Sequence, residues 1–112
     1  MAAIYVSNLV VNTGVNFAQT FTLSSTDSNA AFDLTGYSVK SEVRKWAGAV
    51  GVTTFDATIA NATEGIIILS LTSEKTSAMK AGRHVYDIVV TSGSQKQRVV
   101  EGNVLVREGV TR

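Results

Sequence analysis

Apolar and polar residues alternate with a period of two along most of this chain, and helical periodicity is nearly absent. The segment YSVKSEVRKW (37–46) shows the pattern most sharply, because its apolar positions alternate with Lys40, Glu42 and Arg44. Successive side chains of a β-strand point to opposite faces, so this period is typical of strands that bury one face. Segments of this kind recur at 4–11, 16–24, 37–46, 52–60, 66–72, 83–92 and 95–107. The sequence therefore predicts an all-β chain of about seven strands.

One segment breaks the alternation. TSEKTSAMKAG (72–82) contains helix formers, with Thr72 or Ser73 as a candidate N-cap and Gly82 just after its end. This pattern predicts a short helical turn near residues 73–80 that bridges two strands.

The number and spacing of the strand segments favour a single antiparallel β-sandwich with immunoglobulin-like or Greek-key connections. Gly93 and Ser94 separate the last two segments, which is a strong signal for a two-residue hairpin. A chain of 112 residues fits one domain, and no repeat or linker divides it. We therefore expect a single domain over 1–112, with short N- and C-terminal arms.

Composition excludes several classes of function. The chain has no cysteine, which removes disulfides, thiol nucleophiles and thiolate metal sites. Acidic and basic residues are interspersed at a net charge of +1, so the basic stripe of a nucleic-acid binder is missing. The longest apolar run, GIIIL (65–69), is far shorter than the ~20 residues of a membrane span. We expect no nucleic-acid and no membrane partner, and the first residues lack the pattern of a secretory signal.

Two compositional features bear on whether the chain contacts other protein chains. Charged residues make up 17% of the sequence, below the roughly 25% of typical domains. A low-charge surface fits either coverage by neighbouring subunits or a plain β protein rich in threonine. Proline, which often protects the edges of sheets, is absent. Its absence suggests edges that are protected by pairing with another chain.

The only histidine, His84, lies in the segment GRHVYDIVV (82–90). Strand alternation places His84 and Asp87 on opposite faces, so the two side chains cannot pair within this strand. No nucleophile elbow of the GxSxG type is present, and a single histidine without cysteine is uncommon for a zinc site. Asp27 and Asp33 could share a loop calcium, but turn-forming roles suit them better. The sequence predicts no enzyme activity, no cofactor and no metal.

Trp46 is the strongest candidate for a contact anchor. It follows the 37–46 alternation at its last position and shares the outward parity of Arg44. Tryptophan and arginine are enriched in the hot spots of protein interfaces. The alternative is that a bulge or the sandwich edge turns Trp46 toward the core.

Four residues of the last two strands have structural interpretations. Asp87 and Glu101 lie beside apolar positions in adjacent strands, where cross-strand ion pairs are expected. Their candidate partners are Arg44, Arg83 and Arg98. Tyr86 has inward parity, so we expect a buried ring with its hydroxyl at the rim. Gly102 fits a β-bulge or the close approach of another backbone.

Four motifs occur in an order that resembles a domain of tailed-phage structural proteins. They are DLTG (33–36), VKSEVR (39–44), the block from GIIILSLT to VYDI (65–88), and RVVEGNVLV (98–106). Together they are similar to the N-terminal domain of the phage baseplate upper protein family, and they also resemble small virion proteins of cyanophage type. The resemblance covers roughly residues 15–112. His84 departs from the pattern, which often has an aromatic residue there.

The resemblance implies a non-enzymatic structural protein located in the virion, made in the cytoplasm of the host bacterium. It implies an assembly or adaptor module of the baseplate, tail or fibre-attachment apparatus, with other virion proteins as partners and many copies in a homo-oligomer or symmetric assembly. A capsid decoration protein is the alternative of the same class. An immunoglobulin-like carbohydrate-binding module is a further alternative. The candidate interface residues are Ile4, Tyr5, Arg44, Trp46, Arg107 and Val110.

Overall fold

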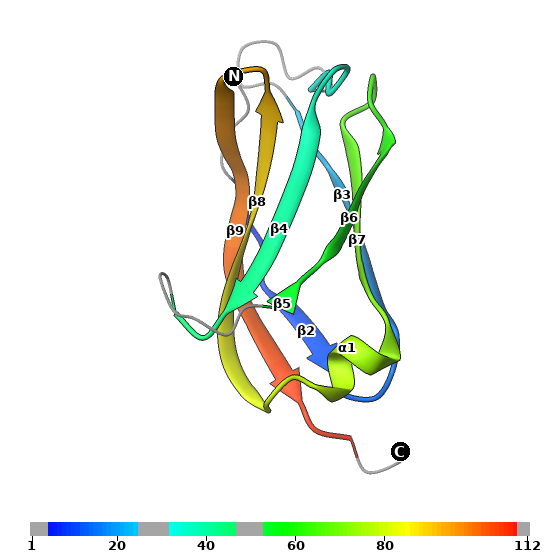
Figure 1. Ribbon diagram of the computed structural model, residues 1–112, viewed down its shortest axis with the longest axis vertical. Coiled ribbons are helices and arrows are strands. Elements are labelled where there is room, and N and C mark those ends of the chain that lie inside the picture. Colours follow the sequence, from blue (N-terminus) through cyan, green and yellow to red (C-terminus); the bar gives the residue numbers. More distant parts are fainter. Residues whose placement is uncertain (1–4, 25–31, 47–52, 110–112) are drawn as a thin grey trace.

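The chain folds into two β-sheets that lie as two layers (Figure 1). The computed structural model describes residues 5–24, 32–46 and 53–109. The larger sheet contains β1 (Tyr5–Val6), β2 (Leu9–Asn12), β4 (Ser38–Arg44), β5 (Thr53–Thr54), β8 (Gly82–Ser92) and β9 (Gln95–Arg107). The smaller sheet contains β3 (Phe17–Thr22), β6 (Asp56–Asn61) and β7 (Ile66–Leu71), in the order β3-β7-β6. The prediction of an all-β chain is confirmed.

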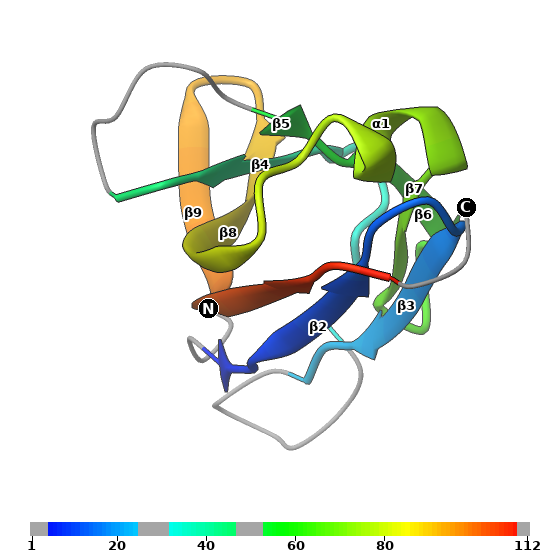
Figure 2. The same ribbon diagram turned by 90° about the horizontal axis from the view of Figure 1, so that it is seen from below.

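The expectation of a purely antiparallel sandwich is wrong, because the larger sheet is mixed. Its order is β1-β9-β8-β4-β5, and β2 also pairs with β9. Both β1 and β2 run parallel to β9, with Tyr5 opposite Val100 and Leu9 opposite Val104. Alternation reports which face of a strand is buried and carries no information on strand direction. The N-terminal segment therefore lies in one sheet and β3, the next strand along the chain, in the other (Figure 2).

Two of the predicted strands are each divided in two. The first is interrupted at Ser7 and Asn8, between β1 and β2. The segment 52–60 is interrupted at Phe55, where the chain leaves the larger sheet as β5 and enters the smaller sheet as β6. Phe55 is only 2% exposed, so the crossing itself is packed in the core.

The helix α1 (Ser73–Ser77) confirms the predicted helical turn but ends before residue 80. The hydroxyl of Thr72 accepts a hydrogen bond from the amide of Lys75, which confirms Thr72 as the N-cap. The amides of Ala78 and Met79 close the last turn by bonding the carbonyls three residues earlier, at 3.2 and 3.1 Å. Gly82 is not part of this cap; it is the first residue of β8.

The core lies between the sheets and is built by the inward residues of both. The ring of Phe55 contacts those of Phe17 and Tyr86, with centroid distances of 5.7 and 6.0 Å. A shift in the pairing of β8 with β9 lies between Ile88 and Val89. This shift leaves Val99 without a partner in β8. Both Val99 and Val100 are completely buried. The tight hairpin between β8 and β9 is confirmed, with Gly93 at a φ of 58°.

Candidate interaction surfaces

Trp46 lies just past the end of β4 and is 63% exposed, as its outward parity predicts. Arg44 is half-buried, and its guanidinium contacts the carboxylate of Glu42 at 3.0 Å. This bond, assisted by Lys40 at 3.4 Å, lowers the pKa of Glu42. The two predicted anchors therefore differ: the indole of Trp46 is exposed, whereas Arg44 is engaged within its own strand.

A pocket of about 450 Å³ opens beside Trp46, between the end of β4 and the start of β8. Among the residues that the structure describes, its lining includes the cationic side chains Lys45 and Lys80 together with His84, and no carboxylate. A ring nitrogen of His84 is 2.8 Å from the carbonyl oxygen of Lys80, which fixes the imidazole against the segment that follows α1. The pocket combines an aromatic ring with positive charge, which suits a ligand with an apolar face and an anionic group.

The other predicted interface residues lie at or near the chain ends. Ile4 and Val110 are outside the described residues, as is Asp27 of the suggested calcium loop. The backbone of Tyr5 is part of β1 and pairs with β9. Arg107 is the last residue of β9 and is exposed opposite Asn12. Residues 5–12 thus run along the sheet of their own domain.

Ser7 and Asn8, which separate β1 from β2, lie against Gly102 of β9. The hydroxyl of Tyr86 donates a hydrogen bond to the Ser7 carbonyl at 2.6 Å, and the amide of Asn103 donates one to the side chain of Asn8 at 3.0 Å. A Cβ at residue 102 would lie 2.1 Å from the Ser7 carbonyl oxygen, so only glycine fits. The predictions of a close backbone approach at Gly102 and of a buried Tyr86 are confirmed, and burial raises the pKa of Tyr86 to about 12.

An acidic row crosses the outer face of the larger sheet. Glu42, Asp87 and Glu101 occupy directly opposite positions on β4, β8 and β9. They line a groove of about 580 Å³. Asp87 binds Arg98 at 2.9 Å, which confirms one predicted ion pair. The described residues contain no group of three potential ligands that could hold a metal ion.

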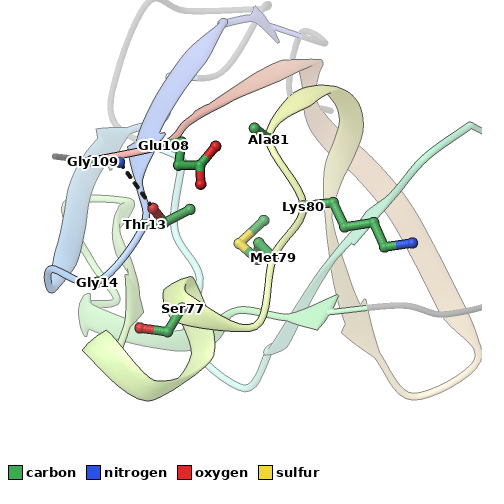
Figure 3. Close-up of a pocket in the computed structure, with 8 residues that line it drawn as sticks. All are labelled: Thr13, Gly14, Ser77, Met79, Lys80, Ala81, Glu108 and Gly109. Atoms are coloured by element: carbon green, nitrogen blue, oxygen red, sulfur yellow. Dashed lines mark hydrogen bonds between the residues drawn. The ribbon is translucent and has the colours of Figure 1, made fainter. Parts of the chain in front are cut away.

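A second pocket, of about 350 Å³, lies at the end of the molecule near α1 (Figure 3). Thr13, Ser77, Met79 and Glu108 are among the residues around it, and the Thr13 hydroxyl accepts a hydrogen bond from the Gly109 amide at 3.2 Å. The sequence pattern did not indicate this pocket, because its lining comes from segments that are far apart along the chain.

The charged residues are divided unequally between the two sheets. The strands of the smaller sheet carry one, Asp56, which is bound by Lys75 at 3.2 Å. Strands β4, β8 and β9 carry nine: Lys40, Glu42, Arg44, Arg83, Asp87, Lys96, Arg98, Glu101 and Arg107. The outer face of the smaller sheet is therefore nearly free of charge. Composition indicated the low charge of the chain but not where it is concentrated.

No protein-family model matches this sequence, and no curated protein matches it. Among solved structures, the N-terminal domain of phage TP901-1 ORF48 is similar, with a TM-score of 0.56 and 8% sequence identity over 94% of this chain and 97% of that one. Listeria monocytogenes InlP is similar with a TM-score of 0.51 and 15% identity over 90% of this chain, which spans only 26% of InlP. At these identities the likeness is one of fold. The chain thus shares its fold with a domain of a phage protein.

Within the described residues, no helix is long and apolar enough to cross a membrane.

Proposed function

We propose that this chain is a non-enzymatic structural protein of a tailed-phage virion that acts by packing against other virion proteins. One observation carries the proposal: the fold matches the N-terminal domain of phage TP901-1 ORF48 over nearly the full length of both chains. The order of motifs between residues 33 and 106 supports the same direction. The outer face of the smaller sheet, whose strands carry only one charged residue, also supports it, because the cores of protein interfaces are depleted in charge.

Within the virion, the chain serves as an assembly or adaptor module of the baseplate, tail or fibre-attachment apparatus. The resemblance to the N-terminal domain of the baseplate upper protein family favours this location. The placement of β3-β7-β6 against β9-β8-β4 supports an immunoglobulin-like connectivity, to which the parallel N-terminal strands are an addition. A capsid decoration protein remains the alternative of the same class.

Deleting the gene in a phage that encodes this chain tests the proposal. Mass spectrometry of purified wild-type particles is expected to detect the chain, and the deletion is expected to yield fewer infectious particles, with recovery when the chain is supplied in trans. Separating tails from capsids before the analysis distinguishes a tail or baseplate component from a decoration protein. Wild-type particles that lack the chain would contradict a virion role.

A carbohydrate-binding module is the second candidate, because an exposed indole beside three basic side chains suits an acidic saccharide. Trp46 is the only tryptophan, so a change in its fluorescence on titration reports this pocket directly. A saturable change with acidic but not neutral saccharides, abolished by the double substitution of Lys45 and Lys80 with alanine, would support this function. If neither acidic nor neutral saccharides change the fluorescence, the carbohydrate-binding function is contradicted.

A further inference from the structure

The strand edges of this fold differ in how they are protected. An unpaired edge is a template for another strand, and proteins block such edges with short strands, charges, prolines or bulges. Strands β1 and β5 have two residues each and β2 has four. Strand β6 carries Asp56 and a register shift between Ile59 and Asn61. Each of these edges has at least one protective feature.

Strand β3 has none of them. Its six residues, FAQTFT, pair with β7 without interruption and include no charge, proline or glycine. Among the described residues, no strand pairs with the other edge of β3. Ala18, Thr20 and Thr22 of this strand are exposed on the outer face of the sheet.

The free edge presents a defined set of backbone groups. The amide of Leu23 bonds the carbonyl of Gly65 toward the β7 side. Because hydrogen-bonding direction alternates along a strand, the odd-numbered residues of β3 bond toward β7. The amides and carbonyls of Ala18, Thr20 and Thr22 therefore point outward. The Thr20 carbonyl is met by the side-chain amide of the adjacent Gln19, at 3.4 Å.

We infer that β3 pairs antiparallel with β3 of a second copy of this chain, about a twofold axis through Thr20. This inference rests on the proposed function and names one partner for the assembly module. With the axis at Thr20, Thr20 of one chain lies opposite Thr20 of the other, and Ala18 of each chain lies opposite Thr22 of the other. All outward backbone groups of the three residues are then paired. The two smaller sheets become one continuous sheet.

Charge is the reason to choose a second copy as the partner. A twofold axis brings each surface against itself, so charged residues near the axis meet like charges. Strand β3 has no charge, and the outer face of its sheet carries only Asp56, on the far strand. Threonine directly opposite threonine on a sheet is favourable. Strands β4, β8 and β9 of the larger sheet, by contrast, carry nine charged residues.

A pair of matched lysine substitutions tests this arrangement. Thr20 and Thr58 are both exposed and lie on either side of Ile68, in β3 and β6. We expect the wild-type chain to form dimers in a concentration series by light scattering or sedimentation. Thr20→Lys is expected to weaken the dimer at least tenfold, whereas Thr58→Lys leaves it unchanged. Circular dichroism confirms that both variants are folded.

A cysteine scan gives an independent test, because the chain has no native cysteine. Residues of a hydrogen-bonded antiparallel pair have Cα atoms about 5.5 Å apart, within the range of a disulfide. Mild oxidation of Thr20→Cys is expected to link two chains, whereas Thr58→Cys stays unlinked. A wild-type monomer at all concentrations, or a dimer that Thr20→Cys does not cross-link, overturns the inference.

The inference and the proposed function can fail separately. A chain that is a strict monomer in solution but is present in purified virions would contradict the β3 pairing and would support the virion role. A chain that dimerises through β3 but is absent from purified particles would support the pairing and would contradict the virion role.

Discussion

The backbone carbonyl of Ser7 occupies the space that a side chain at residue 102 would need. Gly102→Ala puts a Cβ 2.1 Å from the Ser7 oxygen, and because this neighbour is backbone, the N-terminal segment must move away from β9. We expect a loss of about 1–3 kcal/mol in the free energy of unfolding, as in other cases of overpacking. Urea denaturation monitored by circular dichroism measures it.

Deleting residues 1–8 is the matched control for this substitution. If the alanine acts through Ser7, its cost disappears in the shortened chain, and the two changes are not additive. An equal cost in both backgrounds would locate the strain elsewhere in β9.

Tyr86→Phe removes the hydrogen bond to the Ser7 carbonyl and is expected to lower the free energy of unfolding by about 1–2 kcal/mol at neutral pH. The folded pKa of about 12 lies above the ordinary value of about 10. The native state therefore holds this proton more tightly than the unfolded state does. Its contribution is complete below about pH 10 and is lost as the pH rises toward 12.

Comparison of denaturation curves for wild type and Tyr86→Phe at several alkaline pH values isolates this effect. The difference in the free energy of unfolding between the two proteins is expected to shrink across that interval. A difference that stays constant would show that burial of the phenol does not affect its ionisation.

Sequence reasoning succeeds at residues whose environment follows from strand parity. The inward ring of Tyr86, the exposed indole of Trp46 and the pair between Asp87 and Arg98 all depend only on which face a residue occupies and which strand is adjacent. Gly102 was predictable as a place of close approach. The identity of the approaching group, Ser7, was not, because it depends on the unpredicted parallel pairing.

At the scale of elements, a buried hydroxyl of α1 contacts the β2–β3 connection, in addition to the hydrogen bond that the Ser73 amide donates to Asn16 at 2.9 Å. Thr76 is completely buried, and its Oγ1 accepts a hydrogen bond from the Gly14 amide at 3.1 Å and lies 2.8 Å from the Val15 carbonyl oxygen. Thr76→Val preserves the shape and leaves these backbone groups unpaired. We expect a loss of about 2–3 kcal/mol in urea denaturation.

The control is Ser77→Ala, one residue further along the same helix at an exposed position. It is expected to change the free energy of unfolding by less than about 0.5 kcal/mol, as surface substitutions usually do. Equal losses from the two substitutions would contradict a specific contribution of the buried Thr76 hydroxyl, because Ser77→Ala does not lower helix propensity.

Elements are predictable in kind but not in partnership. Alternation located the strands, and the helix formers of 72–82 with a candidate cap at Thr72 or Ser73 located the helix. The alternation over 52–60 continues through Phe55 without a break. Phe55 would be buried in the single strand that we predicted, and it is also buried in the structure, where the chain passes from β5 to β6. Sheet membership is decided by packing between distant segments, which a local pattern does not contain.

At the scale of the whole molecule, the low charge of the sequence is a property of one layer. The strands of the smaller sheet carry a single charged residue, and those of the larger sheet carry nine, all of them on β4, β8 and β9. Composition alone left open whether the chain is uniformly rich in threonine or has a face adapted for contact. The structure shows that the charge is unevenly divided between the layers, and the proposed contact face rests on that division.

This division predicts how self-association responds to salt. Between 0.1 and 1 M salt the screening length falls from about 10 Å to about 3 Å, which weakens contacts between exposed charges. Pairing through β3 involves no charged side chain, so we expect the dimer dissociation constant to change less than about threefold over this range, by sedimentation. A dimer that dissociates steeply with salt would contradict β3 pairing and would instead place Glu42, Asp87, Glu101 and their arginine neighbours in the interface, since their face is the one that carries charge.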